Sequence, residues 1–292
     1  MKIKLYKTLL NYKYYILILL SIVLYTYYYL NIPYEGFQVK TINKTIWILW
    51  LQGWDSAPWL SRQVVKSWEV KNPDWNVVLL TYDNIKDYVD DIDYVYRDTI
   101  SPQAKSDIIR LSLLKKYGGV WADATLLCME PLDSWIDNAI QPSGIWMYRG
   151  RGGGDLTNGP ACWFIISIAG NSIITKWKNA CDYYWRERQT AEIYYWVDGI
   201  FKMLCEIDAE FKREWERVPY LHCDDRYQAH MFTNGSWKQN TLEVKEILYK
   251  SPPHVLKLWN KQWSDEFPNV NSERCKQSNG YYAIQLAISE KS

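Results

Sequence analysis

The residues best suited to chemistry lie in one stretch of 20 residues, 106–125. Asp107 and Arg110 stand three residues apart, a spacing that places both side chains on one face of a helix. Asp123 follows two glycines and a short apolar run. A carboxylate is a hard oxygen ligand for Mg²⁺ or Mn²⁺, and an Asp/Arg pair offers hydrogen bonds to ribose, base or phosphate. The pattern predicts a site for a phosphate-containing ligand, assisted by a divalent cation.

The elements around these residues predict how they converge. Residues 102–117 carry an apolar stripe at helical spacing, with Ser101 as a candidate N-cap and Gly118-Gly119 as the stop signal. Residues 120–122 then read as a short buried strand that ends at Asp123. Ligands of open α/β sheets bind outside the carboxyl ends of the strands, so we expect the Asp/Arg pair and Asp123 to border one crevice.

The rest of the pattern is typical of an α/β domain with a mostly parallel sheet, because apolar strands alternate with helices. The strand-like segments are short apolar runs bounded by turn residues, at 45–51, 75–81, 144–148 and 161–167. The helix-like segments are 58–70, 171–188 and 192–217. Residues after about 260 are polar and poorly patterned. We therefore predict one catalytic domain at 45–260 and a C-terminal tail at 261–292.

The N-terminus carries a predicted membrane anchor at residues 14–30, within 21 consecutive uncharged residues. This length suits a short spanning helix, and tyrosines at both ends suit the two membrane interfaces. The tail at 1–13 holds four lysines and no acid, which predicts a cytoplasmic N-terminus, a stem at 31–44 and a type II protein. The alternatives are a cleaved signal peptide and a buried helix. A cleaved signal peptide is disfavoured because the segment lacks a small-residue cleavage site. A buried helix is disfavoured because the segment is apolar all round and lies at a terminus.

Composition excludes some functions and leaves others open. The 34 basic and 33 acidic residues nearly cancel, so no basic excess points to nucleic-acid binding. The 17 tryptophans and 24 tyrosines suit either the stacking of sugar rings or a ring-rich core. The six cysteines form no C-x-x-C pair. Residues 222–225 (His-Cys-Asp-Asp) contain metal-ligand types without a ligand spacing, and we interpret them as a solvated turn.

A family resemblance rests on the pattern S-D-x-x-R-x-x-x-L-x-x-x-G-G-x-W-x-D-A-T, which spans residues 106–125. This pattern resembles the capsular polysaccharide synthesis proteins, which are related to glycosyltransferase family 32 with its DXD sugar-binding motif. Segments 46–53, 72–81, 210–220 and 251–257 also resemble that family. The similarity covers about residues 44–260.

The resemblance implies a GT-A fold, a nucleotide-sugar donor such as a UDP- or GDP-sugar, a glycan acceptor and Mn²⁺ or Mg²⁺. It also implies hexosyl transfer with retention of anomeric configuration. Where the wider family has a second aspartate, this chain has Thr125, a weaker metal ligand. The capsular subgroup resembles this chain in its D-A-T form. The substitution leaves open how tightly a metal binds.

The resemblance also implies roles for individual residues. It places Trp50 at the nucleobase, Asp107 and Arg110 at the ribose and neighbouring groups, and Asp123 at the metal and diphosphate. Leu49 and Thr125 are further candidate donor-binding residues. The resemblance also places His254 as a late metal ligand and Lys257 near the phosphates. For Trp50 a core position, and for His254 an ordinary loop position, are equally open.

The transfer step is less visible in the sequence. Asp123 and Asp198 are the candidate catalytic residues, and Asp155 and Asn158 are candidates for the acceptor side. No nucleophile stands out, which keeps open a second class, a catalytically inactive carbohydrate-binding or scaffolding protein. A structural membrane protein is a third class, but the Asp107–Asp123 pattern disfavours it.

Overall fold

The computed structural model describes residues 40–150, 159–233 and 235–289, all within a unit that starts at Lys40. None of the helices in these three ranges has both the length and the apolar character needed to cross a membrane. The predicted anchor at 14–30 lies outside the described residues, as do Asp155 and Asn158.

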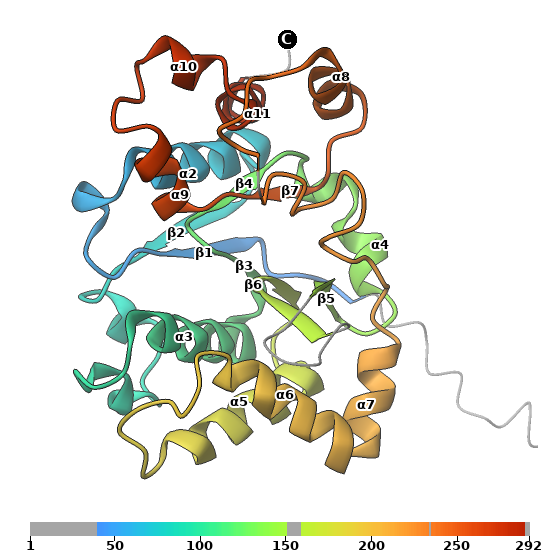
Figure 1. Cartoon of the computed structure of the whole chain (residues 1–292). Coiled ribbons are helices and arrows are strands. Elements are labelled where there is room, and N and C mark those ends of the chain that lie inside the picture. The colour runs from blue at the N-terminus through green and yellow to red at the C-terminus, as the bar shows by residue number, and fades with distance from the viewer. Residues whose placement is uncertain (1–39, 151–158, 234, 290–292) are drawn as a thin grey trace, which may run out of the picture. The chain divides into compact units, whose positions relative to one another are not determined.

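A five-stranded sheet in the order β2-β1-β3-β6-β5 forms the centre of this unit (Figure 1). The strands are β1 (Thr45–Leu49), β2 (Asn76–Leu80), β3 (Gly119–Ala122), β5 (Ile145–Gly150) and β6 (Gly159–Ser167). β2, β1 and β3 are parallel neighbours, and β6 runs against both β3 and β5. The predicted α/β class with a mostly parallel sheet is confirmed, with one reversed strand.

Helices cover both faces of the sheet (Figure 1). On one side lie α2 (Trp59–Lys71), α9 (Asn260–Glu266) and α11 (Asn279–Ile288). On the other lie α3 (Pro102–Tyr117), α5 (Ser172–Trp185) and α6 (Trp196–Ile207). The remaining helices are α4 (Ile136–Ile140), α7 (Ala209–Glu216), α8 (Leu242–Lys250), α10 (Glu273–Lys276) and four single 3₁₀ turns, η1 (Trp54–Ser56), η2 (Ile85–Asp87), η3 (Asp93–Tyr96) and η4 (Leu132–Ser134).

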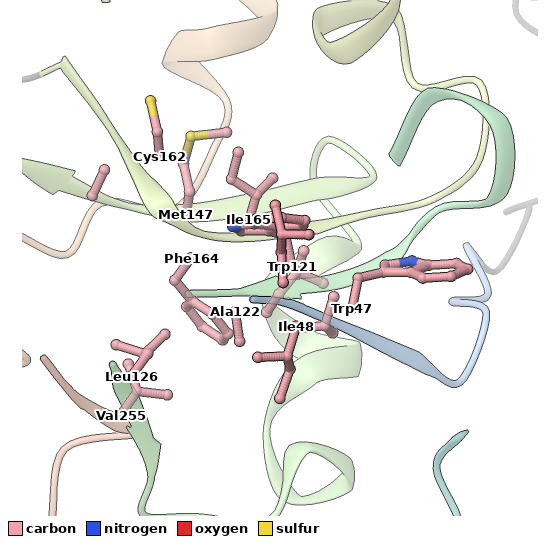
Figure 2. Close-up of a cluster of buried hydrophobic side chains, with 14 of the residues drawn as sticks. Trp47, Ile48, Trp121, Ala122, Leu126, Met147, Cys162, Phe164, Ile165 and Val255 are labelled. Atoms are coloured by element: carbon pink, nitrogen blue, oxygen red, sulfur yellow. The ribbon is translucent and has the colours of Figure 1, made fainter. Parts of the chain in front are cut away.

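The core explains why the strands read as continuous apolar runs. All five residues of β1 and all four of β3 are buried, as expected for strands covered on both faces. Figure 2 shows Ile48, Trp121 and Phe164, from three strands, within one apolar cluster. Aromatic rings such as those of Trp121 and Phe164 bury a large apolar area, and this burial is the main favourable contribution to folding.

The turn between α3 and β3 requires its two glycines. Gly118 and Gly119 have φ of 67° and 94°, a region that side chains rarely adopt. A Cβ on Gly118 would lie 2.5 Å from the amide nitrogen of Ala169, and one on Gly119 would lie 2.5 Å from the carbonyl oxygen of Thr45. The chain can therefore reverse tightly here and bring Asp123 to the carboxyl end of β3.

A two-stranded antiparallel sheet extends the fold beyond Asp123. β4 (Leu126–Cys128) pairs with β7 (Val255–Lys257), so that Leu126 is opposite Lys257. The amide of Leu258 donates to the carbonyl of Thr125 at 2.8 Å. This pairing holds residues more than 130 positions apart in the chain next to each other.

The structure differs from the sequence-based prediction in two helical regions. The helix expected at 192–217 begins at Trp196 and breaks at Asp208, whose carboxylate caps α7 by accepting from the amides of Glu210 and Phe211. The residues after 260, where no pattern was visible, form α9, α10 and α11. α11 buries Ala283, Ile284 and Ala287 and packs against α2, so small side chains and tertiary contacts stabilise it.

Candidate active site

A cavity of about 630 Å³ opens where β1 and β3 end. Its volume is typical of small-molecule sites. Eight residues proposed from the sequence line it, namely Leu49, Trp50, Asp107, Arg110, Asp123, Thr125, Asp198 and Lys257. Strands β1, β3 and β7 and helices α3 and α6 therefore each bring at least one predicted residue to the same space.

Both carboxylate oxygens of Asp123 accept hydrogen bonds at the wall of this cavity. Its Oδ1 accepts from Arg110 Nη2 at 3.2 Å and from Trp121 Nε1 at 3.0 Å. Its Oδ2 accepts from Lys257 Nζ at 2.7 Å. Burial acts to raise the pKa of this carboxyl, but the charges of Lys257 and Arg110 outweigh it and hold the pKa below its usual value. Asp123 is therefore an ionised carboxylate at neutral pH.

Arg110 connects α3 to β3 and β6 through both ends of its guanidinium. Nη1 contacts Asp107 Oδ1 at 3.0 Å and donates to the carbonyl of Cys162 at 2.9 Å. Nη2 donates to Ser106 Oγ at 3.0 Å and also reaches Asp123. Because the fork is planar and rigid, only an arginine can satisfy these groups together.

Two other carboxyls in the cavity hold their protons more tightly than usual. Burial raises the pKa of Asp107 to about 7, although Arg110 opposes this, and burial raises the pKa of Asp198 to about 6. The thiol of Cys162 contacts Asp198 Oδ1 at 3.5 Å. Since burial favours the protonated forms of these two acids, less negative charge opposes an anionic group such as a diphosphate beside Arg110 and Lys257.

The cavity is lined by oxygen groups of the type that a hard divalent cation binds. A carboxylate has about four lone-pair positions, and Asp123 uses three of them for Arg110, Trp121 and Lys257. Thr125 and Asn260 line the same cavity. The Oδ1 atom of Asn260 is buried and has no hydrogen-bond partner among the described residues. Such an unsatisfied oxygen is costly unless a ligand or ion pairs with it.

Two segments that contain histidine differ from the sequence-based expectation. His254 does not line the cavity, because its ring stacks on Trp135 at 4.0 Å and its Nδ1 pairs with Glu130. The 222–225 segment was interpreted as a solvated turn, but Cys223 is buried and lines the cavity. The possible ligand atoms of His222, Cys223 and Asp224 lie within 4.8 Å of one another. Burial raises the pKa of the Cys223 thiol to about 12, which disfavours the thiolate that a metal would need.

The structure settles the position of Trp50 and adds residues that the sequence did not indicate. Trp50 is partly exposed, packs against the edge of the core and lines the cavity just beyond β1. The cavity residues absent from the sequence-based set include Asn260 and several rings, Trp163, Tyr194, Tyr195, His230 and Trp259. The only sequence signal for Asn260 was its position three residues after Lys257, which ends a strand. Tyr194 and Tyr195 were placed inside a helix.

The sequence has relatives among known families and proteins. Residues 23–270 match the family described as capsular polysaccharide synthesis protein. Over 116 residues the chain is 29% identical to an initiation-specific alpha-1,6-mannosyltransferase of Candida albicans, covering 37% of this chain and 30% of that protein. Over 157 residues it is 27% identical to the O-glycosyltransferase braB of Annulohypoxylon truncatum, covering 47% and 36%. The chain thus spans about a third of the length of these relatives.

Two solved structures show a distant similarity. One is the PaToxG glycosyltransferase, with a TM-score of 0.41 and 16% identity, covering 84% of this chain and 86% of that one. The other is the catalytic domain of alpha-toxin from Clostridium novyi, with a TM-score of 0.37 and 11% identity, covering 86% and 81%.

Proposed function

Because the chain belongs to the capsular polysaccharide synthesis protein family, we propose that it is a glycosyltransferase that moves a hexosyl group from a nucleotide-sugar donor to a glycan acceptor. The observation that carries this proposal is the position of Asp123 between Arg110 and Lys257 in a cavity at the ends of β1 and β3. The two glycosyltransferases similar to part of the chain support the same reaction class.

In this proposal the diphosphate of the donor lies against Arg110 and Lys257. Negative charge grows on the leaving diphosphate as the glycosidic bond breaks, and fixed cations stabilise such charge strongly inside a cavity. Asp123, Thr125 and Asn260 would hold Mn²⁺ or Mg²⁺, which supplies additional charge neutralisation on the diphosphate oxygens. The lowered pKa of Asp123 keeps it ionised for this role.

The nucleoside of a UDP- or GDP-sugar would occupy the part of the cavity formed by Trp50 and Leu49. A ring face such as that of Trp50 can stack on a base, and Asp107 can accept hydrogen bonds from ribose hydroxyls. Asp107 can do so only while Arg110 holds it in place, which gives the i,i+3 pair a function beyond stabilising α3.

Asp198 is the proposed catalytic carboxyl on α6. Above about pH 6 it is ionised, and its charge would stabilise the positive character that develops on the transferred sugar. Retention of anomeric configuration is part of the proposal because of the family 32 resemblance. In addition, residues 14–30 would anchor the enzyme as a type II membrane protein, with a lumenal catalytic domain in a eukaryotic host.

The test is nucleotide release by the full chain in detergent micelles, with UDP- and GDP-sugars, Mn²⁺ and a mixture of oligosaccharides. We expect one donor to be turned over, and we expect Asp123→Asn to lower the rate by about 100- to 1,000-fold. Asp90→Asn is the matched control, because Asp90 is an exposed carboxylate outside the cavity. A chelator should abolish the activity, and added Mn²⁺ should restore it.

The contrary outcome is also informative. If calorimetry detects no donor binding to wild type, the assignment of this cavity to a nucleotide sugar is wrong. Thr125, in place of a second carboxylate, favours one other candidate, a carbohydrate-binding protein without catalysis. That candidate predicts glycan binding that Asp123→Asn leaves intact, with no nucleotide release from any donor.

A further inference from the structure

Two neighbouring tyrosines at the edge of the cavity are unusually exposed. Tyr194 is 71% exposed and Tyr195 is 48% exposed, and both line the cavity. Their rings lie 4.9 Å apart with an angle of 85° between their planes. Large rings are normally buried, and exposed pairs beside a cavity mark binding surfaces.

The segment beneath these rings is firmly held. Trp196 follows them at the start of α6, is buried, and stacks on Tyr184 at 5.4 Å. The carbonyl of Tyr195 accepts from the amide of Gly199, within the first turn of α6. Because the backbone that carries the two rings is already ordered, ligand binding would cost little backbone freedom, which favours affinity.

The surroundings indicate which part of the reaction this surface serves. Asp198, three residues beyond Tyr195 on α6, lines the same cavity. Although most of the Tyr194 side chain is exposed, partial desolvation of its hydroxyl, and then Asp107, Tyr195 and Asp123, raise its pKa, so the hydroxyl lies within electrostatic range of the charged site. The positive groups that would hold the diphosphate, Arg110 and Lys257, come from α3 and β7. The charge of Arg110 also acts on Tyr194 and opposes the rise in its pKa, so the two tyrosines border the donor site.

We propose that Tyr194 and Tyr195 form the acceptor subsite, where the apolar C–H face of a pyranose ring of the acceptor glycan packs on the exposed rings. The proposal rests on the proposed function, and it deepens it by naming residues for the acceptor. Tyrosine suits this role because its ring is apolar and its hydroxyl can hydrogen-bond to sugar hydroxyls. In this proposal Asp198 lies next to the anomeric carbon of the transferred sugar, in agreement with its proposed catalytic role.

A glycan fits this surface better than a purely apolar acceptor. The neighbouring cavity groups include the carboxyls of Asp107 and Asp198, which pair with Arg110 and Cys162 through one oxygen each. An apolar chain would offer nothing to their remaining lone pairs. A sugar ring presents apolar C–H groups to the tyrosines and hydroxyls to the carboxyls. The family description, polysaccharide synthesis, agrees with this chemistry.

The test measures acceptor KM and donor KM separately, with the full chain and the donor found by nucleotide release. The acceptor probes are trisaccharides of mannose, glucose and galactose. We expect Tyr194→Ala and Tyr195→Ala each to raise the acceptor KM about tenfold, equivalent to about 1.4 kcal/mol. The donor KM should change by less than about twofold. Tyr195→Phe, which keeps the ring, should retain most of the acceptor affinity.

Tyr249→Ala is the matched control, because Tyr249 is 75% exposed on α8 and does not line the cavity. Acceptor KM values equal to wild type in both alanine variants would overturn the proposal. A larger rise in donor KM than in acceptor KM would assign the tyrosines to the donor instead. Donor turnover that no trisaccharide accelerates, but a long-chain alcohol does, would exclude a glycan. A wild type without donor binding would refute the proposed function itself, which is a separate result.

Discussion

Two buried clusters in this molecule each hold a basic side chain between two aspartates. Arg110, with 7% of its side chain exposed, lies between Asp107 and Asp123. Lys178, whose side chain is 0% exposed, lies between Asp91 and Asp182. The Arg110 cluster lines the cavity, whereas no member of the Lys178 cluster does. Two clusters with similar charges therefore differ in whether a ligand can reach them.

The difference lies in what surrounds each cluster. Lys178 Nζ contacts both carboxylate oxygens of Asp182 at 2.6 Å, and the Tyr94 hydroxyl donates to the same carboxylate. These contacts join α5 to η3 and are complete without a ligand. The Arg110 cluster instead faces open space and includes an acid, Asp107, whose pKa is raised to about 7. A buried ion pair indicates function only when it borders a cavity with groups still to be paired.

The largest expected effect is that of Arg110→Lys, which keeps the charge but removes the planar fork. Lysine cannot contact Asp107, Asp123 and the carbonyl of Cys162 together. We expect kcat/KM for the donor to fall by about 100-fold or more, measured at a temperature where the variant is folded. A variant with wild-type kinetics would remove the distinction between the two clusters.

The next effect is that of Lys178→Met, which removes the cation from the cluster outside the cavity. Asp182 and Asp91 are left without their partner, but both are partly exposed and can be hydrated. We expect a loss of about 2–3 kcal/mol in the free energy of unfolding, at the low end for a broken buried pair. Steady-state kinetics at a temperature where the variant is folded should match wild type. A specific loss of kcat would mean that this cluster also serves catalysis.

The smallest effect is the pH-dependent stability of Asp198→Asn. The pKa of Asp198 is raised to about 6 in the folded protein, above the usual value of about 3.9. The folded state thus binds this proton more tightly, and wild type loses stability as pH rises from about 4 through 6. Asparagine cannot ionise, so relative to wild type the variant should gain about 2 kcal/mol of stability between pH 4 and pH 8. Thermal unfolding at both pH values measures this, and a difference independent of pH would contradict the raised pKa.

Local signals were enough to predict the element that carries the Asp/Arg pair. The helix at 102–117 was bounded by a capping serine and two glycines, and the structure has α3 at those bounds, with Ser101 Oγ accepting from the amide of Ala104. Capping and left-handed turns depend on neighbours in the chain, which the sequence displays directly. The same reasoning placed Asp123 at the end of β3.

Long-range packing decided the remaining features. The helices after residue 260 depend on contacts such as the stacking of Trp59 on Trp263 and Tyr281, residues far apart in the chain. No local pattern reveals such contacts, because a polar segment becomes helical only when a partner covers its few apolar groups. The unsatisfied oxygen of Asn260 likewise exists only in the folded chain.

The sequence by itself determined the α/β class, the family and the residues Asp107, Arg110 and Asp123, because these follow from local periodicity and fixed spacing. Only the tertiary structure decided that Lys257 reaches Asp123 and that His254 turns away to Trp135 and Glu130. Lys257 and His254 are three positions apart in the chain, with Lys257 at the end of β7 and His254 just before it. Which of them faces the cavity is set by the pairing of β7 with β4, a contact between segments that the sequence does not connect.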